Sequence, residues 1–348
     1  MLDLPVIQKS VDVAGHMTFV CIGALVCMML AWAMQIRVAG FWKAGLLSLT
    51  EILLGEALGL FFAKVVYFLV RFNYLTELGT WRFFMFSFRP VELIRSQSML
   101  DMEFYANLSF FGGVMGVILA VFVSARTWKL PARDVLNRFA PAGALLVAVF
   151  RAAEYYLKLL GVGLLEDVGV PEDGMMSFPL RIGYDTFGYG DPEDLEYYLP
   201  VFVLESVVAL AAMIFALVRM KDRDCFLRTL FYICLGQILL ESMRATSIAW
   251  LFVRVEQLFC FLYVEAVLVV YAVRRYRKKK WTGMIYPALG LLVCGVVIAG
   301  EFALDGKILA DLSKDTIYIV MAAALGTLAA ADVVWQFIAG RDQKLQTA

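Results

Sequence analysis

The strongest constraint in this sequence is the recurrence of apolar stretches of about 20 residues, the length that a helix needs to cross a bilayer. Nine such stretches cover residues 16–36, 45–70, 107–125, 135–160, 200–218, 226–248, 255–273, 284–302 and 316–338. Hydrophobic residues make up 62% of the 348 residues and charged residues only 18%, whereas soluble chains have roughly 25% charged residues. These features exclude a soluble domain, a disordered chain and a disulfide scaffold. We expect an all-α polytopic membrane protein with nine spans.

The distribution of Lys and Arg predicts the orientation, because basic loops stay on the cytoplasmic side. Sixteen Lys and Arg fall in the alternate connections 37–44, 126–134, 219–225, 274–280 and 339–348. The opposite connection 161–199 has one basic and nine acidic residues. We therefore expect the N-terminus outside and the C-terminus in the cytoplasm. The 31 basic and 31 acidic residues balance, so no basic surface points to nucleic acid.

Two outer segments are long enough to have structure of their own. Residues 71–106 interleave aromatic residues with Arg, a pattern typical of a segment that lies in the membrane interface. Residues 161–199 are rich in Gly, Pro, Asp and Tyr, and the run 178–189 is compatible with a short hairpin. We expect this second segment to form a small extracytoplasmic head.

Ionisable side chains inside spans are costly and by default mark a functional site. Five spans carry polar residues at a similar depth, in the outer half of the membrane. They are Lys64, Arg151, Glu154, Lys158, Glu205, Gln237, Glu241, Arg244, Glu256 and Gln257. Gln237, Glu241 and Arg244 are spaced i, i+4, i+7 and so share one helix face. We expect one shared cavity that opens to the outer leaflet.

Two explanations fit these polar residues. The first is a pocket for a phospholipid head group, in which the planar guanidinium of Arg binds two phosphate oxygens. The second is a structural network of ion pairs between helices, which would satisfy the same charges. The residue types alone do not choose between them.

Several kinds of chemistry lack the residues they need. His16 is the one histidine, and its position at a span end favours an interfacial side chain over a base. The six cysteines include no CxxC pair and the chain has no phosphate-binding loop. We therefore expect no metal and no cofactor. The small-residue run from Gly112 to Gly116 is typical of close helix packing.

The stretch from Ser109 to Gly116 resembles the Ser-Phe-His-Gly-Gly-Leu-x-Gly motif of the prolipoprotein diacylglyceryl transferase family. Other segments resemble family motifs in the same order: 63–68 resembles Gly-Arg-Ile-Gly-Tyr-Val, 150–154 Gly-Arg-Ile-Gly-Asn, 200–205 Pro-Thr-Gln-Leu-Tyr-Glu, 237–244 Arg-Phe-x-x-Glu-x-x-Arg, and 256–257 the Gly-Gln that opens the last family span. The resemblance covers about residues 10–280.

The resemblance implies a bacterial inner-membrane protein with seven spans and a small periplasmic head. Such an enzyme moves diacylglycerol from phosphatidylglycerol to the cysteine thiol of a preprolipoprotein. We therefore predict two domains: a seven-span transferase-like core over 1–280, and two additional transmembrane helices with a cytoplasmic tail over 281–348. The expected partners are a phosphatidylglycerol-like phospholipid and either a lipobox-bearing preprolipoprotein or another membrane protein.

The resemblance is to a divergent member, because the differences from the family motifs fall on the site. Phe111 replaces the motif histidine, which is the family's candidate for the base. Glu154 replaces an Asn, Gln237 an Arg and Phe202 a Gln. The residues that stay in register are Arg151, Glu205, Glu241, Arg244, Gly112 and Gly113, with Lys64 in place of an Arg.

The resemblance implies roles for these positions. Arg151 and Arg244 would bind the lipid phosphate with help from Lys64, and Glu241 or Glu154 would serve as the base. The residues expected to support the site are Gly112, Gly113, Phe111, Glu205, Gln237 and Gln257. Two hypotheses stay open: a divergent transferase, or a catalytically inactive relative that acts as a phospholipid-binding or complex-forming membrane subunit.

Overall fold

The computed structural model describes residues 2–8, 13–70, 82–83, 86–87, 108–156, 164–165, 180–185, 195–220, 223–244, 248–250, 253–277, 281–309 and 311–347. The predicted interfacial segment 71–106 lies outside these residues, apart from the short strands β2 (Arg82–Phe83) and β3 (Phe86–Ser87). Much of the predicted head, 161–199, and Lys158 also lie outside them.

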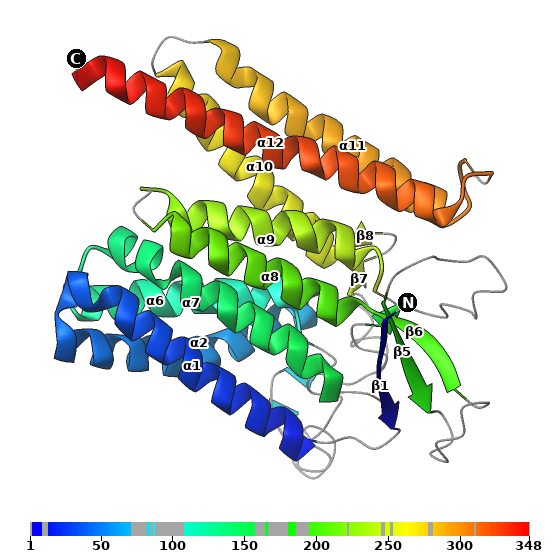
Figure 1. The fold of residues 1–348 in the computed structure, drawn as a ribbon, viewed down its shortest axis with the longest axis horizontal. Coiled ribbons are helices and arrows are strands. Elements are labelled where there is room, and N and C mark those ends of the chain that lie inside the picture. The colour runs from blue at the N-terminus through cyan, green and yellow to red at the C-terminus, as the bar shows by residue number, and fades with distance from the viewer. Residues whose placement is uncertain are drawn as a thin grey trace.

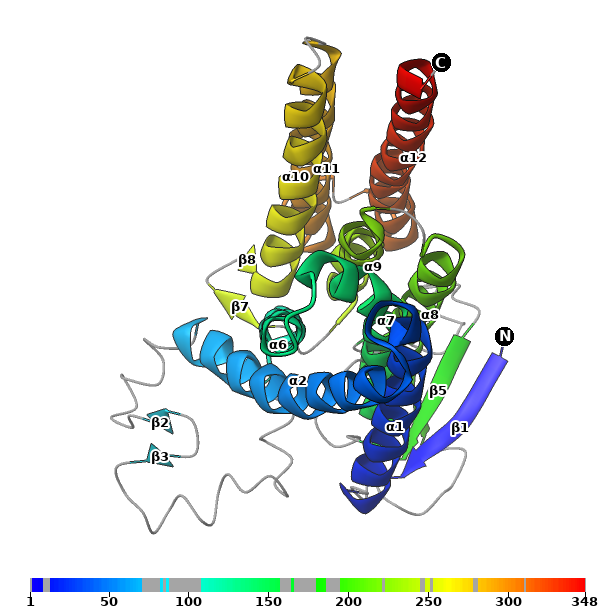
Figure 2. The same ribbon diagram turned by 90° about the vertical axis from the view of Figure 1, so that its left-hand side faces the viewer.

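The described residues form a bundle of long helices. These are α1 (Val13–Ala39), α2 (Phe41–Val70), α6 (Phe110–Thr127), α7 (Ala132–Ala153), α8 (Val201–Val218), α9 (Cys225–Glu241), α10 (Val255–Tyr276), α11 (Ile285–Leu304) and α12 (Lys314–Thr347). Eight of them are long and apolar enough to cross a membrane, which confirms an all-α polytopic membrane protein. In Figures 1 and 2, α10–α12 lie on one flank, α1 and α2 on the other, and α6–α9 between them.

The helix at the sixth predicted span is shorter than we expected. We expected it over 226–248, but α9 has 17 residues and ends at Glu241, a length of about 25 Å. The backbone N–H groups of Ser242, Met243 and Arg244 each donate to the carbonyl three residues earlier. This tighter turn stops the α-helix. The chain then forms the short strand β7 (Ala249–Trp250), which pairs with β8 (Val253–Arg254) just before α10. The prediction was wrong about the length of this helix, because tertiary contacts end it inside the apolar stretch.

A small sheet forms at the end of the bundle where α8 begins. Its strand order is β1-β5-β6-β4, with β1 (Leu2–Gln8) parallel to β5 (Leu180–Asp185) and β6 (Leu195–Pro200) antiparallel to both β5 and β4 (Leu164–Leu165). The predicted hairpin within 178–189 was wrong in extent, because β5 pairs with a strand that begins only at Leu195. Strand β6 runs directly into α8, so the sheet fixes the point from which α8 enters the bundle.

The basic connections meet at the opposite end of the bundle. Asp224 lies between the guanidinium groups of Arg133, at 2.7 Å, and Arg274. Lys43 lies over the ring of Trp128, 6.0 Å from its centroid. Residues from four connections or their flanking turns therefore share one end, as the charge pattern predicted.

Helices α2 and α6 pack with their backbones in direct contact. A Cβ on Gly112 would lie 2.5 Å from the carbonyl oxygen of Phe62 and 2.9 Å from the Cα of Ala63. A Cβ on Gly116 would overlap the carbonyl group of Leu58. Only glycine allows this approach, so the small-residue run has the packing role that we expected.

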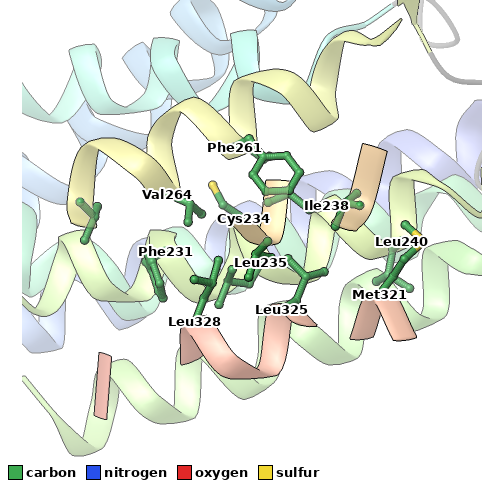
Figure 3. Close-up of a cluster of buried hydrophobic side chains, with 14 of the residues drawn as sticks. Phe231, Cys234, Leu235, Ile238, Leu240, Phe261, Val264, Met321, Leu325 and Leu328 are labelled. Carbon is green, nitrogen blue, oxygen red and sulfur yellow. The ribbon is translucent and has the colours of Figure 1, made fainter. Parts of the chain in front are cut away.

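The last two helices share a hydrophobic core with α9 and α10. Leu325 and Leu328 of α12 pack with Phe231 and Ile238 of α9 and with Val264 of α10, as Figure 3 shows. A domain boundary near residue 280 stays a prediction, but the contacts tie α11 and α12 closely to the core.

Candidate functional site

A cluster of buried charges forms where the C-terminal ends of α7 and α9 meet the N-terminal end of α8. The Nη1 atom of Arg151 lies 2.6 Å from Oε1 of Glu154, and its Nε atom lies 3.3 Å from Oε2 of Glu205. The Nη1 atom of Arg244 lies 2.6 Å from Oε2 of Glu205 and 3.1 Å from Oε2 of Glu154. Each guanidinium therefore contacts both carboxylates.

One neutral side chain joins this cluster to a third carboxyl group. Nε2 of Gln237 donates to Oε1 of Glu205 at 2.9 Å and to Oε2 of Glu241 at 2.7 Å. An arginine here, as in the family motif, would add a positive charge between two carboxylates. The amide keeps the hydrogen bonds but leaves the negative charge of Glu241 without an ion-pair partner at this position.

A fourth carboxyl group enters from α10. Oε2 of Glu256 accepts the backbone N–H of Phe111 at 2.8 Å, and the Ser109 side chain also interacts with this carboxyl group. Its second oxygen, Oε1, is buried and has no hydrogen-bond partner within the described part of the chain. The Phe111 ring stacks on Phe259, with a centroid distance of 5.2 Å and an interplanar angle of 14°.

Helix α11 supports this end of the site. Nη1 of Arg254 donates to the carbonyl oxygens of Glu241 and Arg244, at 2.7 and 2.8 Å, and so caps the carboxyl end of α9. Glu301 on α11 lies 3.5 Å from Nε of Arg254. It also accepts a hydrogen bond from Nε2 of Gln257 at 2.7 Å. One of the two additional helices thus contacts residues that hold Arg244 in place.

The charged cluster closes one end of a cavity of about 230 Å³. Its polar lining consists of His16, Glu56, Ser109, Arg151, Glu154, Thr229, Glu241, Arg244 and Glu256. The remaining lining is mostly apolar and comes largely from α2, α6, α7 and α9. On α7 the lining extends from Phe139 to Arg151, a length of about 18 Å along the helix. The lining therefore combines a group of charged side chains with a long, mostly apolar wall.

Lys64 does not line the cavity, although we expected it to bind the lipid phosphate together with Arg151 and Arg244. It lies 5.8 Å from the centroid of the Tyr67 ring. Glu256 joins instead. Around the described site, four carboxyl groups therefore face two guanidinium groups.

His16 is buried rather than exposed at an interface, which corrects our interpretation of it. It is 3% exposed and lines the cavity. Its Nδ1 atom lies 3.0 Å from the carbonyl oxygen of Ala153, the residue before Glu154.

The structure thus brings most of the predicted residues together. The members of one contact network are Arg151, Glu154, Glu205, Gln237, Glu241 and Arg244. Phe111 and Gln257 border it, whereas Gly112 and Gly113 belong to the α2–α6 contact. The functional roles of all these residues stay predictions. The sequence interpretation placed Glu256 among the polar residues of the expected cavity but gave it no role, quoted Ser109 only as part of a motif, and missed Glu301.

Fold and site define a class of protein. Large apolar side chains such as Leu53, Ile214 and Leu262 are exposed on the helices, as expected for surfaces that face lipid. The charged cluster is enclosed among the helices and joined to an apolar cavity. This is a polytopic membrane protein with a buried charged cluster beside a largely apolar cavity.

Comparison with protein families matches residues 7–273 to prolipoprotein diacylglyceryl transferase, and the chain belongs to this family. A search of curated proteins found no match. The protein is therefore a multi-pass protein of the bacterial inner membrane with a diacylglyceryl transferase-like function, for which the family implies lipid and lipoprotein substrates in general.

Proposed function

We propose that this protein transfers the diacylglyceryl group of phosphatidylglycerol, or a closely similar glycerophospholipid, to a cysteine thiol of a preprolipoprotein. The observation that carries the proposal is the continuity between the buried charged cluster and the apolar cavity. A lipid held there has its ester-linked glycerol beside ionisable groups and its acyl chain among apolar side chains.

Arg151 and Arg244 bind the phosphate in this proposal. Both line the cavity, and both are oriented by Glu154 and Glu205. Arg151 also lies over the ring of Phe110, 4.7 Å from its centroid. Guanidinium groups fixed in this way lose little conformational entropy when they bind an anion. Lys64 acts farther out, where its contact with Tyr67 puts it beside the path of a head group.

The acceptor thiol must lose a proton, since the thiolate is the nucleophile. Phe111 cannot accept that proton. Glu154 is paired with two guanidinium groups, so it is the less suited of the two predicted bases. Glu241 accepts a hydrogen bond from the neutral amide of Gln237 and lines the cavity, so it belongs to the set of carboxyl groups from which a base must come.

The orientation of the proposal follows the basic connections. We place the end that holds Arg133 and Arg274 in the cytoplasm, with the N-terminus outside and the C-terminus inside. The charged cluster then lies in the outer half of the membrane, where a secreted acceptor protein meets it. Cysteine-accessibility labelling at the two ends of the bundle tests this arrangement.

A second candidate has its own supporting observation. Both guanidinium groups already contact two carboxylates each, and Phe111 supplies a stacked ring where the motif has a histidine. These features suit an inactive relative that binds a phospholipid or joins a complex through α11 and α12.

One assay separates the candidates. Purified protein receives labelled phosphatidylglycerol and a lipobox peptide, and both peptide labelling and co-purifying lipid are measured. Labelled peptide supports the transferase, whereas retained lipid without labelled peptide supports the inactive relative. Arg151→Ala should lose lipid. Arg126 is an exposed arginine near the C-terminal end of α6 and outside the cavity lining, so Arg126→Ala should retain lipid. Equal lipid content in the two variants contradicts the phosphate-binding role of Arg151.

A further inference from the structure

We propose that Glu256 accepts the proton of the attacking thiol, in the place of the missing motif histidine; this assignment rests on the proposed transferase function. Glu256 is the second residue of α10, is 3% exposed and lines the cavity. Its position is fixed by the Phe111 N–H, which donates to Oε2 at 2.8 Å. Oε1 stays buried without a donor in the described structure. A ligand that enters the cavity can supply one.

The contact with Phe111 makes this assignment specific. Phe111 stands where the family motif has histidine, and Glu256 stands where the motif of the last family span has glycine. The two replaced residues belong to different helices, yet they touch through a hydrogen bond. One replacement removes a proton acceptor and the other introduces one beside the same backbone position. Glu256 therefore supplies the function that Phe111 cannot perform.

The hydrogen-bond donors of Glu256 differ from those of Glu154 and Glu205. Glu154 and Glu205 are both paired with Arg151 and Arg244, which hold their negative charge. Glu256 has neutral donors instead.

The groups that face Glu256 are Ser109 before α6, Arg151 of α7, Glu241 of α9, Arg244 just after α9, and Cys260 on its own helix. Arg151 and Arg244 stabilise the carboxylate that accepts the proton, and Glu241 repels that carboxylate, so a proton gained by Glu256 relieves the repulsion.

The reaction step balances with Glu256 in this role. The S–H bond of the acceptor cysteine breaks and its proton moves to Oε1 of Glu256. The sulfur electron pair forms a bond to the terminal glyceryl carbon of the lipid. The bond from that carbon to the phosphate ester oxygen breaks, and its electron pair leaves with glycerol phosphate, which the guanidinium groups of Arg151 and Arg244 stabilise. The products are a thioether and a glycerol phosphate, and no oxidant is needed.

Glu256→Gln tests the assignment with minimal disturbance, because the amide oxygen still accepts the Phe111 N–H. A general base contributes roughly 10²- to 10⁴-fold, so we expect peptide labelling to fall by at least about 100-fold while co-purified phosphatidylglycerol is unchanged. Glu265→Gln, on the same helix but outside the cavity lining, should label peptide at the wild-type rate. In a Phe111→His and Glu256→Gln double variant, the imidazole should raise the rate of peptide labelling at least about tenfold above that of Glu256→Gln alone.

The outcomes separate this inference from the proposed function. Labelling by Glu256→Gln within about threefold of wild type overturns the role of Glu256 and leaves the transferase in place. No labelling by the wild-type protein overturns both. If Glu256→Gln loses lipid or stability, the Phe111→His and Glu256→Gln double variant is measured instead. Recovered peptide labelling in the double variant supports the assignment. A double variant that is folded and binds lipid but does not label the peptide contradicts the assignment.

Discussion

Replacing Asp332 on α12 should destabilise the protein more than most single changes in the described structure. Its carboxylate is completely buried and pairs with the guanidinium of Arg228 on α9 through contacts of 2.9 to 3.2 Å. Tyr232, Tyr271 and Gln336 donate to the same carboxylate, at 2.7, 2.6 and 2.9 Å. In Asp332→Ala the Arg228 charge stays buried without its partner, which typically costs about 3–5 kcal/mol.

This cost can be converted into a shift of the unfolding midpoint. With an unfolding entropy of about 2.1 cal/mol/K per residue near 60 °C, the 348 residues give about 0.7 kcal/mol/K. The midpoint should therefore fall by about 4–7 °C. The measurement is the fraction of monodisperse protein that survives heating in mild detergent, followed by size-exclusion chromatography.

Two matched variants identify the cause. Gln336→Ala removes one neutral donor and should lower the midpoint by only about 1–2 °C, since one hydrogen bond contributes about 1 kcal/mol. Replacing Asp332 and Arg228 together by leucine and methionine removes the stranded charge and should recover most of the loss. A midpoint for Asp332→Ala within about 1 °C of wild type would refute the reasoning, because the ion pair would then not hold α12 to α9.

Three further predictions test other parts of the molecule. Gly116→Val forces α2 and α6 apart and should lower the midpoint by at least about 3 °C in the same heating assay, whereas Gly295→Val on α11, where nothing lies within 4 Å of a Cβ, should not. Burial raises the pKa of Asp224, but the hydrogen bonds and charges of Arg274 and Arg133 outweigh it and leave the pKa below its usual value. The stability that this carboxylate provides is present above about pH 4 and is lost as the pH falls through the lowered pKa, so the difference in midpoint between wild type and Asp224→Asn should be smaller near pH 3 than at pH 7. Glu301→Gln weakens the support of Arg254 and should reduce peptide labelling by up to about fivefold with unchanged lipid selectivity; labelling equal to wild type would show that α11 is not needed to position the site.

The helical architecture could be predicted because hydropathy and charge are local properties. An apolar stretch of spanning length must become a helix in lipid, since no other isolated segment satisfies its own backbone there. The i, i+4, i+7 spacing of Gln237, Glu241 and Arg244 likewise fixed their common face, and the structure places Gln237 and Glu241 in hydrogen-bond contact. The end of α9 could not be predicted, because Arg254, ten or more residues away, donates hydrogen bonds to the carbonyl oxygens of Glu241 and Arg244 there.

Which residues form the charged cluster was harder to predict than the depth in the membrane at which they lie. Depth follows from position along a span, but the direction of a side chain depends on how each helix is rotated in the bundle. Lys64 has the right depth and points toward Tyr67, outside the cavity lining. Glu256 has the right depth and points into it. Nothing in the local pattern distinguishes these two residues, and only the packed helices do.

The resulting charge balance constrains any ligand of the site. Arg151 and Arg244 are matched by Glu154 and Glu205. Glu241 and Glu256 remain as two further carboxyl groups, which accept hydrogen bonds from the amide of Gln237 and from the backbone N–H of Phe111. With four carboxyl groups and two guanidinium groups, an excess of negative charge in a buried cluster is costly, and a phosphate would add more. A phospholipid can bind here only if protons occupy some of these carboxyl groups or if donors on the ligand meet them. The hydroxyl groups of a glycerol head group and the thiol of an acceptor cysteine are such donors, and the thiol can also give up its proton. The same imbalance that makes this site unsuitable for a bare anion therefore suits it to a ligand that brings protons with it.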